Sequence, residues 1–307
     1  MCIIFFIIML FKSTRIVLES VVRGIDIWKN NIFPSLFPFL IISHIMIEYG
    51  FIHLFKEIFN PILSLFKLNS SASFVLAMSI MSGSPSNAKY TKELYLKNKL
   101  TKDEAEKTLT FTYFSSPLFI LGTLSLLYLK DIKVGYLILF VHIISNFFIG
   151  LIFRNYGIPS KNDKTDIKLG IKKMLTEQKS KKLSTVIVNS IKESLSTIFL
   201  ILGSIIFIYI VTSTLQNIIP NNPYFNASIK GILEVTQGLF YTSLLNIDMR
   251  YKATLSIMLL SFGGISIYIQ IISILSDTDL STKPYIVARV LHSAISGMLL
   301  YLIYPFI

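Results

Sequence analysis

The chain has 307 residues, of which 53% are hydrophobic and only 15% are charged, and its mean hydropathy is +0.65. A soluble protein of this length needs far more charge to cover its surface, so the composition excludes the soluble classes and indicates an integral membrane protein. The formal net charge of +12 lies largely between apolar runs, which fits the positive-inside rule of membrane proteins better than nucleic-acid binding.

The N-terminal residues are apolar and include the single cysteine, Cys2, which excludes a disulfide framework and a cysteine-based metal cluster. No small-residue cleavage site follows, and Lys12 and Arg15 come next. We therefore interpret residues 1–11 as a short first span rather than a removable signal peptide. Residues 1–31 are assigned to this span and an amphipathic segment. We expect neither a metal nor another cofactor.

Residues 32–49 form the next apolar run and approach the ~20 residues that cross a bilayer as a helix. Residues 51–68 mix aromatic side chains with charges, which predicts an amphipathic helix at the membrane interface. An ordinary short span is the alternative for this segment.

The segment 81–89 reads Met-Ser-Gly-Ser-Pro-Ser-Asn-Ala-Lys and ends an apolar stretch with small polar residues. Backbone polar groups must be satisfied inside a bilayer, so such a break is tolerated only where it lines a protein-enclosed cavity, which in transporters holds the substrate. We expect residues 72–96 to enter and leave on the same side. Ser84 and its proline predict a helix start at membrane depth, and Ser86 and Asn87 add hydrogen-bond donors.

The apolar run at residues 109–129 contains a second serine–proline pair at Ser116, preceded by Ser115. It predicts another helix N-terminus inside the membrane, where unpaired N–H groups and the helix dipole attract anions. A proline kink with a back-bonded serine is the alternative. The sequence TKDE at residues 101–104 predicts a capping box at the start of the helix that enters this run, and residues 134–153 predict the next span.

The densest group of basic residues lies between residues 154 and 182. The positive-inside rule places this region in the cytoplasm, and we assign residues 157–185 to a basic cytoplasmic loop. A polybasic contact with lipid headgroups is the alternative.

The second half has a polar break of its own at residues 231–238, where Glu234 is the most telling residue. A carboxylate at membrane depth is costly, so it indicates proton coupling or contact with the substrate. Thr236 and Gln237 lie beside it. The alternative is a location at the membrane interface, near Lys230.

Two adjacent glycines, Gly263 and Gly264, free the backbone at a further break, and Gln270 follows in the same apolar segment. Arg289 lies in the last apolar run. Three interpretations are open for it: an ion pair with Glu234, contact with an anionic substrate, or snorkelling to the interface.

Two histidines, His142 and His292, are candidates for proton coupling together with Glu234. His292 shares a helix face with Arg289, three residues earlier. The alternative for each histidine is a packed, hydrogen-bonded residue.

When the sequence is compared with itself at a constant offset of about 150 residues, several polar residues coincide. His142 then falls on His292, and Ser116 falls on Ser266. If the first half crosses the membrane an odd number of times, the second copy is inserted in the opposite orientation, as in secondary transporters. We predict an all-α polytopic membrane protein with two inverted repeats of broken or re-entrant helices, at residues 32–156 and 186–307. Residues 50–105 then share the cytoplasmic side with the basic loop, and residues 216–251 face the other side.

The same motifs carry a family resemblance. The sequences SGSPSNAKYTKEL from Ser82, FSSPLF from Phe114, GILEVTQG from Gly231 and LSFGGI from Leu260 resemble the YlbJ-type sporulation integral membrane proteins. That family belongs to the Gate-domain or nucleoside-recognition group, whose fold is similar to that of concentrative nucleoside transporters. The resemblance implies Gate-type repeats, a location in the outer forespore membrane and export of dipicolinate toward the forespore for spore maturation.

We therefore predict a carrier for a small anionic solute, not an enzyme, with one site between the two repeats. Its expected partners are the lipid bilayer and the small-molecule substrate; a homo-oligomer is left open, and no nucleic acid is expected. The alternatives are a nucleoside-like solute, a non-transporting scaffold needed for the spore cortex, and an intramembrane enzyme with a serine–histidine dyad at Ser84. The predicted substrate-binding residues are Ser84, Ser86, Asn87, Ser115, Ser116, Glu234, Thr236, Gln237, Gly263, Gly264, Gln270 and Arg289.

Overall fold

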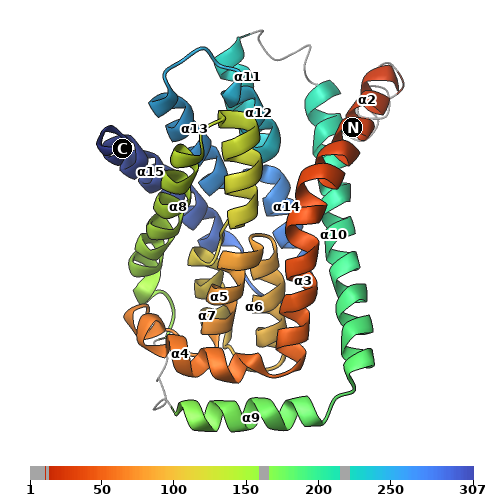
Figure 1. Cartoon of the computed structure of the whole chain (residues 1–307), viewed down its shortest axis with the longest axis vertical. Coiled ribbons are helices and arrows are strands. Elements are labelled where there is room, and N and C mark those ends of the chain that lie inside the picture. Colours follow the sequence, from red (N-terminus) through yellow and green to blue (C-terminus); the bar gives the residue numbers. More distant parts are fainter. Residues whose placement is uncertain (1–10, 12–13, 159–165, 215–221) are drawn as a thin grey trace.

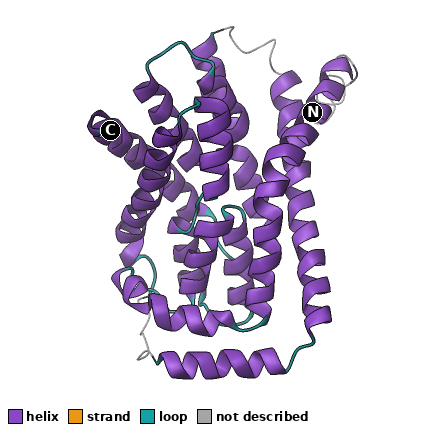
Figure 2. Ribbon diagram, in the orientation of Figure 1, coloured by secondary structure: helices purple, strands orange, loops and turns teal. Residues whose placement is uncertain are grey.

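The computed structural model describes residues 11, 14–158, 166–214 and 222–307, so nearly all of the predicted first span at residues 1–11, including Cys2, lies outside the described part. The described residues are mainly helical and contain no strand (Figure 2). Within these described ranges, four helical segments are long and apolar enough to cross a membrane, and a bent pair, Thr14–Ile32 with Leu36–Glu48, turns by 56° at its break. The prediction of an all-α polytopic membrane protein is confirmed. The four segments are Ile132–Asn155, Leu183–Thr214, Met249–Leu275 and Lys283–Phe306.

The first repeat combines a hairpin with a broken span. The helices α5 and α6 start and end near α4, and their tip reaches the middle of the bundle (Figure 1). The short helix α7 then leads through a break into η2, and α8 returns alongside η2. The elements are α2 (Thr14–Ile27), η1 (Trp28–Ile32), α3 (Phe33–Glu48), α4 (Phe51–Leu65), α5 (Ala72–Ser82), α6 (Ser86–Leu96), α7 (Lys102–Phe111), η2 (Phe119–Leu129), α8 (Ile132–Ile152) and η3 (Phe153–Asn155).

The second repeat has the same order of elements in the opposite orientation. The hairpin of α11 and α12 enters from the end of the bundle opposite to α4, and α13 continues through a break into α14 (Figure 1). The predicted inversion is confirmed. After α9 (Ile167–Lys179), which precedes this repeat, the elements are α10 (Leu183–Thr214), α11 (Pro223–Leu233), α12 (Val235–Ser243), α13 (Met249–Phe262), α14 (Gly264–Leu275), α15 (Lys283–Ile303) and η4 (Tyr304–Phe306).

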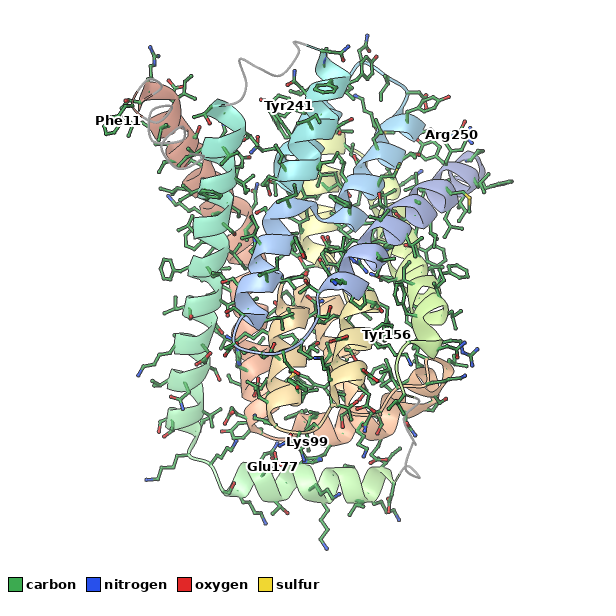
Figure 3. The ribbon with its side chains drawn as sticks, turned by 180° about the vertical axis from the view of Figure 1, so that it is seen from behind. Phe11, Lys99, Tyr156, Glu177, Tyr241 and Arg250 are labelled. Carbon is green, nitrogen blue, oxygen red and sulfur yellow. The ribbon has the colours of Figure 1, made fainter. Side chains whose placement is uncertain are left out.

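The two ends of the bundle are easily told apart. Lys99 and Glu177 lie at the end that carries α4 and α9, which we call the α9 end, whereas Tyr241 and Arg250 lie toward the other (Figure 3). The ends of α5 and α6 that lie away from their tip share the α9 end, as the sequence predicts for residues 50–105 (Figure 1).

Helix starts follow local capping chemistry. The predicted capping box is present at α7: the Thr101 hydroxyl accepts from the Glu104 N–H at 3.3 Å, and the Glu104 carboxylate accepts from the Thr101 N–H at 2.8 Å. Asp131 caps α8, and Asn222 caps α11, whose first residue is Pro223. These short polar residues fix where each helix begins.

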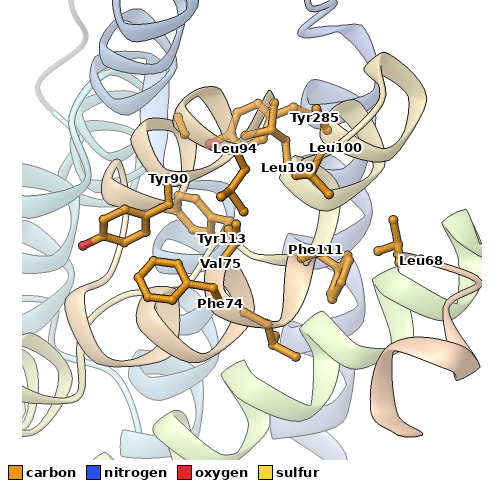
Figure 4. Packing of buried hydrophobic residues seen from close by; sticks show 14 of the residues in the cluster. Leu68, Phe74, Val75, Tyr90, Leu94, Leu100, Leu109, Phe111, Tyr113 and Tyr285 are labelled. Carbon is orange, nitrogen blue, oxygen red and sulfur yellow. The ribbon is translucent and has the colours of Figure 1, made fainter. Parts of the chain in front are cut away.

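The interior is held by close packing of small and aromatic residues. In α11 and α12, Gly231 and Gly238 lie against one another, so a side chain at either position would clash with the other helix. Close backbone approach of this kind stabilises helix pairs in membranes, where the hydrophobic effect between helices is weak. A cluster that includes Phe74, Tyr90 and Tyr113 fills the space around α5, α6 and α7 (Figure 4).

The basic region after α8 differs from the predicted loop. It contains a helix, α9, which lies across the end of the bundle and packs on α4 (Figure 1). Gly170 allows the close approach, because a Cβ there would lie 2.9 Å from the carbonyl oxygen of His53. His53 Nε2 and Glu177 Oε1 are 2.9 Å apart, and the Asp166 N–H donates to Glu57 at 2.7 Å. The helix predicted from residues 51–68 forms as α4 and also runs across this end rather than through the bundle.

Candidate functional site

The breaks of the two repeats meet around one central cavity of about 70 Å³. One wall comes from the hairpin tips and broken spans, and the other is apolar and comes from η1, α3 and α10. The polar part of the lining is Ser84, Ser115, Ser116, Glu234, Thr236 and Gln270, and the apolar part is Ile32, Leu36, Pro85, Phe119, Ile201, Ile205, Val235 and Ile267.

The tip of the first hairpin packs directly on the break after α7. Gly83 has φ +79°, and a Cβ there would lie 2.8 Å from the Ser116 nitrogen, so glycine is required by both conformation and space. The Ser84 N–H donates to the Phe114 carbonyl at 2.7 Å. These contacts hold the tip of the α5–α6 hairpin against the break between α7 and η2.

The prediction that Ser84 caps α6 is wrong. That helix begins at Ser86, Pro85 occupies the position before it, and no side chain caps its N-terminus. The Ser84 hydroxyl donates instead to Asn87 Oδ1 at 2.9 Å. Ser86 and Asn87 are fully buried beside the tip and do not line the cavity. The N-terminus of α6 therefore follows directly on two cavity-lining residues, Ser84 and Pro85, and has no side-chain cap.

The second serine–proline pair behaves as predicted. A short helical turn begins directly after Ser116, whose hydroxyl accepts from the Phe119 N–H at 3.3 Å. The Ser115 N–H donates to His142 Nε2 at 3.0 Å, so the backbone of the break is held by α8. The segment is therefore a true helix start and not a kink in a continuous helix.

Glu234 lies at the tip of the second hairpin, in the middle of the bundle, and is only 2% exposed. It is the N-cap of α12: its carboxylate accepts from the Gln237 N–H at 2.8 Å and from the Thr236 hydroxyl. This position does not fit the interfacial alternative. Gln237 itself points away from the cavity, because its amide donates to Thr212 of α10 at 3.1 Å.

The glycine pair forms the fourth break. Gly263 and Gly264 have φ +85° and +79°, a conformation that side-chain-bearing residues rarely adopt. A Cβ on Gly264 would lie 3.2 Å from the Gly231 carbonyl oxygen, so α14 starts directly against α11. Neither glycine lines the cavity, but Gln270 further along α14 does, and its amide donates to Ser266 at 3.3 Å.

The two histidines meet in the core beside the cavity, with ring centroids 4.9 Å apart. His142 Nε2 accepts from the Ser115 N–H, so its proton is on Nδ1 and is donated to Ser261 Oγ at 3.1 Å. His292 Nδ1 accepts from Arg289 at 2.8 Å, so its proton is on Nε2 and is donated to Ser145 Oγ at 2.8 Å. Both rings are thus neutral with opposite tautomers, as in the packed, hydrogen-bonded alternative.

Arg289 takes none of the three predicted roles in this structure. It is 2% exposed, so it does not snorkel, and it does not line the cavity. Its guanidinium donates to His292, to the Thr110 carbonyl and to Asn146 Oδ1 at 3.4 Å, and it lies over the Tyr113 ring with 4.5 Å to the centroid. Its partners are therefore carbonyls, an amide, an imidazole and a ring rather than Glu234.

Sequence reasoning missed the apolar wall of the cavity and the role of Asn146. Asn146 is fully buried, and its amide donates to the Tyr113 carbonyl at the break after α7. Its position one helical turn after His142, in an otherwise apolar span, is the signal that indicates it. No comparable signal marks Ile201 or Ile205, because apolar residues are expected throughout α10.

The cavity combines helix N-termini with one carboxylate. The N-terminal ends of α6, α12 and the helical turn after Ser116 all face it, which makes the site attractive to negative charge. Glu234 is the single ionisable residue in the described lining. Among the described residues, no group of three His, Cys, Asp or Glu side chains has the arrangement of a metal site. The volume is below the ~300 Å³ of typical ligand pockets, so the two walls lie close together in this conformation.

Comparisons with known proteins agree with the resemblance predicted from the motifs. Residues 31–130 match a family model described as "Gate: Nucleoside recognition". The chain is 27% identical over 315 residues to the sporulation integral membrane protein YlbJ of Bacillus subtilis (strain 168), which covers 93% of this chain and 77% of that protein. No solved structure gives a significant match. The resemblance predicted from the motifs is confirmed.

Proposed function

We propose that this chain is a carrier that moves a small anionic solute, dipicolinate, across the outer forespore membrane toward the forespore during spore maturation. The observation that carries the proposal is the central cavity, where broken helices of both repeats present N-termini, hydroxyl groups and one carboxylate. Broken helices at membrane depth are costly unless they serve a polar site, and this arrangement is typical of secondary transporters. A non-transporting scaffold needs neither the breaks nor the buried polar groups.

The helix N-termini are the binding element for the anion in this proposal. The Ser116 hydroxyl accepts from the Phe119 N–H and so keeps its own proton to donate, which lets a carboxylate bind without a cationic side chain. Glu234 and a bound dianion repel each other when both are ionised, so binding favours the protonated form of Glu234. Transport of the anion is thereby coupled to a proton carried on Glu234.

The small cavity volume requires the site to open during each cycle. The hairpin tips form one side of the cavity, and Leu36 and Ile201 lie on the other, so relative movement of these two walls enlarges it. Alternating exposure of the cavity toward the two ends of the bundle follows if the two inverted repeats exchange their conformations.

A second candidate is a nucleoside-like solute, and one observation favours it specifically. The described lining contains no lysine or arginine, whereas Glu234, Gln270 and the serine hydroxyls suit the hydroxyl and base groups of a neutral polar molecule. The description of the matching family model points the same way.

We propose no catalytic role. A serine–histidine dyad requires a histidine on the Ser84 hydroxyl, which instead donates to Asn87. Both ring nitrogens of His142 are bound to Ser115 and Ser261.

The test is uptake into proteoliposomes containing the purified full chain, with labelled dipicolinate and labelled uridine measured in parallel. We expect dipicolinate uptake above empty vesicles, stimulated by an inward proton gradient, and loss of that stimulation in Glu234→Gln. Lys99→Gln, exposed at the α9 end and outside the cavity lining, is the matched control. Uridine uptake without dipicolinate uptake would establish the second candidate, and uptake of neither by folded protein would refute the carrier function.

A further inference from the structure

A second and larger cleft, of about 1050 Å³, lies toward the α9 end between α3, α6, α10 and α14. Its lining is mostly polar and charged, in contrast to the hydrocarbon that surrounds the bundle. The residues that matter for its role are His44, Lys89, Lys92, Thr197, Ser196 and Ser273.

The cleft continues the central cavity along the same helices. On α14, Gln270 lines the cavity and Ser273 lines the cleft; on α10, the corresponding residues are Ile201 and Thr197. At the start of α6, Pro85 lines the cavity, and Lys89, four residues later, lines the cleft. Such spacings correspond to about one helical turn, or ~5 Å, so only one layer of side chains separates the two spaces.

Two polar atoms in the lining of the cleft are left unpaired. His44 Nε2 and Ser190 Oγ have no hydrogen-bond partner within the protein, although these residues are only 6% and 1% exposed. Buried polar atoms are normally paired, so these two unpaired atoms make the packing beside the cleft less favourable in this conformation.

The charge of the cleft favours anions. Four lysines line it against three glutamates; Glu48 pairs at 2.7 Å with Lys181 and Lys92 at 2.5 Å with Asp277, both partners lying outside the lining, so an excess of one positive charge remains. A cleft with low-dielectric walls and an excess of positive charge concentrates anionic solutes at its mouth.

Lys89 lies at the junction of the two spaces and ties two helices together. Its ammonium donates to Thr197 Oγ1 at 2.7 Å and to the Glu193 carbonyl at 2.9 Å, and it lies 3.2 Å from Glu193 Oε2. All three contacts bind α6 of the first repeat to α10 of the second.

We propose that this cleft is the vestibule through which the solute reaches the central cavity from the α9 end, and that Lys89 is its gate residue. A solute carboxylate replaces Thr197 and Glu193 as the partner of the Lys89 ammonium, which releases α6 from α10 and opens the layer between cleft and cavity. The proposal rests on the proposed carrier function and specifies its access route and the carboxylate class of its substrate.

Labelling of single cysteines tests the vestibule without measuring transport. In a Cys2→Ser background, an impermeant maleimide is applied to membrane vesicles of each orientation. Lys172→Cys on α9 identifies the α9 side, Ser196→Cys reports the cleft, and Phe199→Cys is the matched control. Ser196 and Phe199 are both exposed on α10, but Phe199 does not line the cleft, and its 55% exposure faces the hydrocarbon region.

We expect Ser196→Cys to react from the same side as Lys172→Cys and Phe199→Cys to react from neither, because maleimides need a hydrated thiolate. The proposal of a vestibule is overturned if Ser196→Cys reacts only from the opposite side, or if it reacts as slowly as Phe199→Cys. The expected labelling combined with no flux of any solute refutes the carrier function and leaves the aqueous cleft established, so the two failures are distinguishable.

Substitution of the lysine tests the gate. Dipicolinate is expected to slow labelling of Ser196→Cys, and Lys89→Gln should raise the concentration needed for this protection at least about tenfold, as expected for loss of a charge-assisted hydrogen bond. Lys89→Arg should retain most of the protection. Lys99→Gln, exposed at the α9 end but outside the lining of the cleft, should change it less than about twofold. Unchanged protection in folded Lys89→Gln overturns the gate role.

Discussion

The carboxylate of Glu234 gives the sharpest test of the site, because one residue both caps a helix and is expected to carry a proton. Glu234→Ala removes the acceptor for the Gln237 N–H and for the Thr236 hydroxyl, both buried at the hairpin tip. Each lost bond costs about 1 kcal/mol net, so the free energy of unfolding should fall by about 2 kcal/mol. Glu234→Gln keeps one carbonyl oxygen as acceptor and should lose no more than about 1 kcal/mol.

The assay is thermal unfolding of the purified variants in detergent, combined with proton-dependent uptake in proteoliposomes. At about 2–4 °C per kcal/mol, Glu234→Ala should unfold about 4–8 °C below the wild type, whereas Glu234→Gln should stay within about 4 °C. Glu234→Gln should nevertheless lose the stimulation of uptake by a proton gradient. If Glu234→Ala unfolds at the temperature of the wild type, the buried cap is contradicted. If Glu234→Gln keeps the stimulation of uptake by a proton gradient, the proposed coupling is contradicted.

The remaining predictions concern three other parts of the bundle. Gly263→Ala should lower the unfolding temperature, because the φ of +85° is strained for alanine and the new methyl group meets a tyrosine hydroxyl. Gly203→Ala, which has open space around its new Cβ, should not lower it. Arg289→Met should destabilise the protein by about 2–4 kcal/mol, since it removes a buried donor of several hydrogen bonds, and a wild-type unfolding temperature would rule out this core role. The pKa of Asp279 is held below its ordinary value of 3.8 by a hydrogen bond from the Tyr95 hydroxyl and by a nearby lysine. This contact therefore stabilises the loop after α14 above about pH 4, and the stabilisation is lost as the pH falls through the folded-state pKa. Hydrogen exchange of the loop should therefore rise at low pH in the wild type, and Asp279→Asn should exchange faster already at neutral pH; equal exchange at neutral pH would refute the contact.

The class of protein and the places where its helices break follow from the order of residues alone. The chemistry of the bilayer makes every polar interruption visible, so Ser84, Ser116, Glu234 and Gly263 could be predicted as breaks without any knowledge of contacts. The inversion of the repeats was equally readable, since it depends on the number of spans and on the distribution of charge.

Which groups share a site depends on how separate helices pack, and this is visible only in the folded structure. Arg289 was predicted near the substrate or Glu234, but the packing of α15 against α7 and α8 places its guanidinium among backbone carbonyls and beside His292. Likewise, Ser84 has the sequence signature of a cap, yet its hydroxyl binds Asn87, because the hairpin tip is fixed by contacts with the next break. Local sequence sets where a helix begins; the partner that a long or polar side chain reaches depends on how separate helices pack, and that information is distributed over the whole chain.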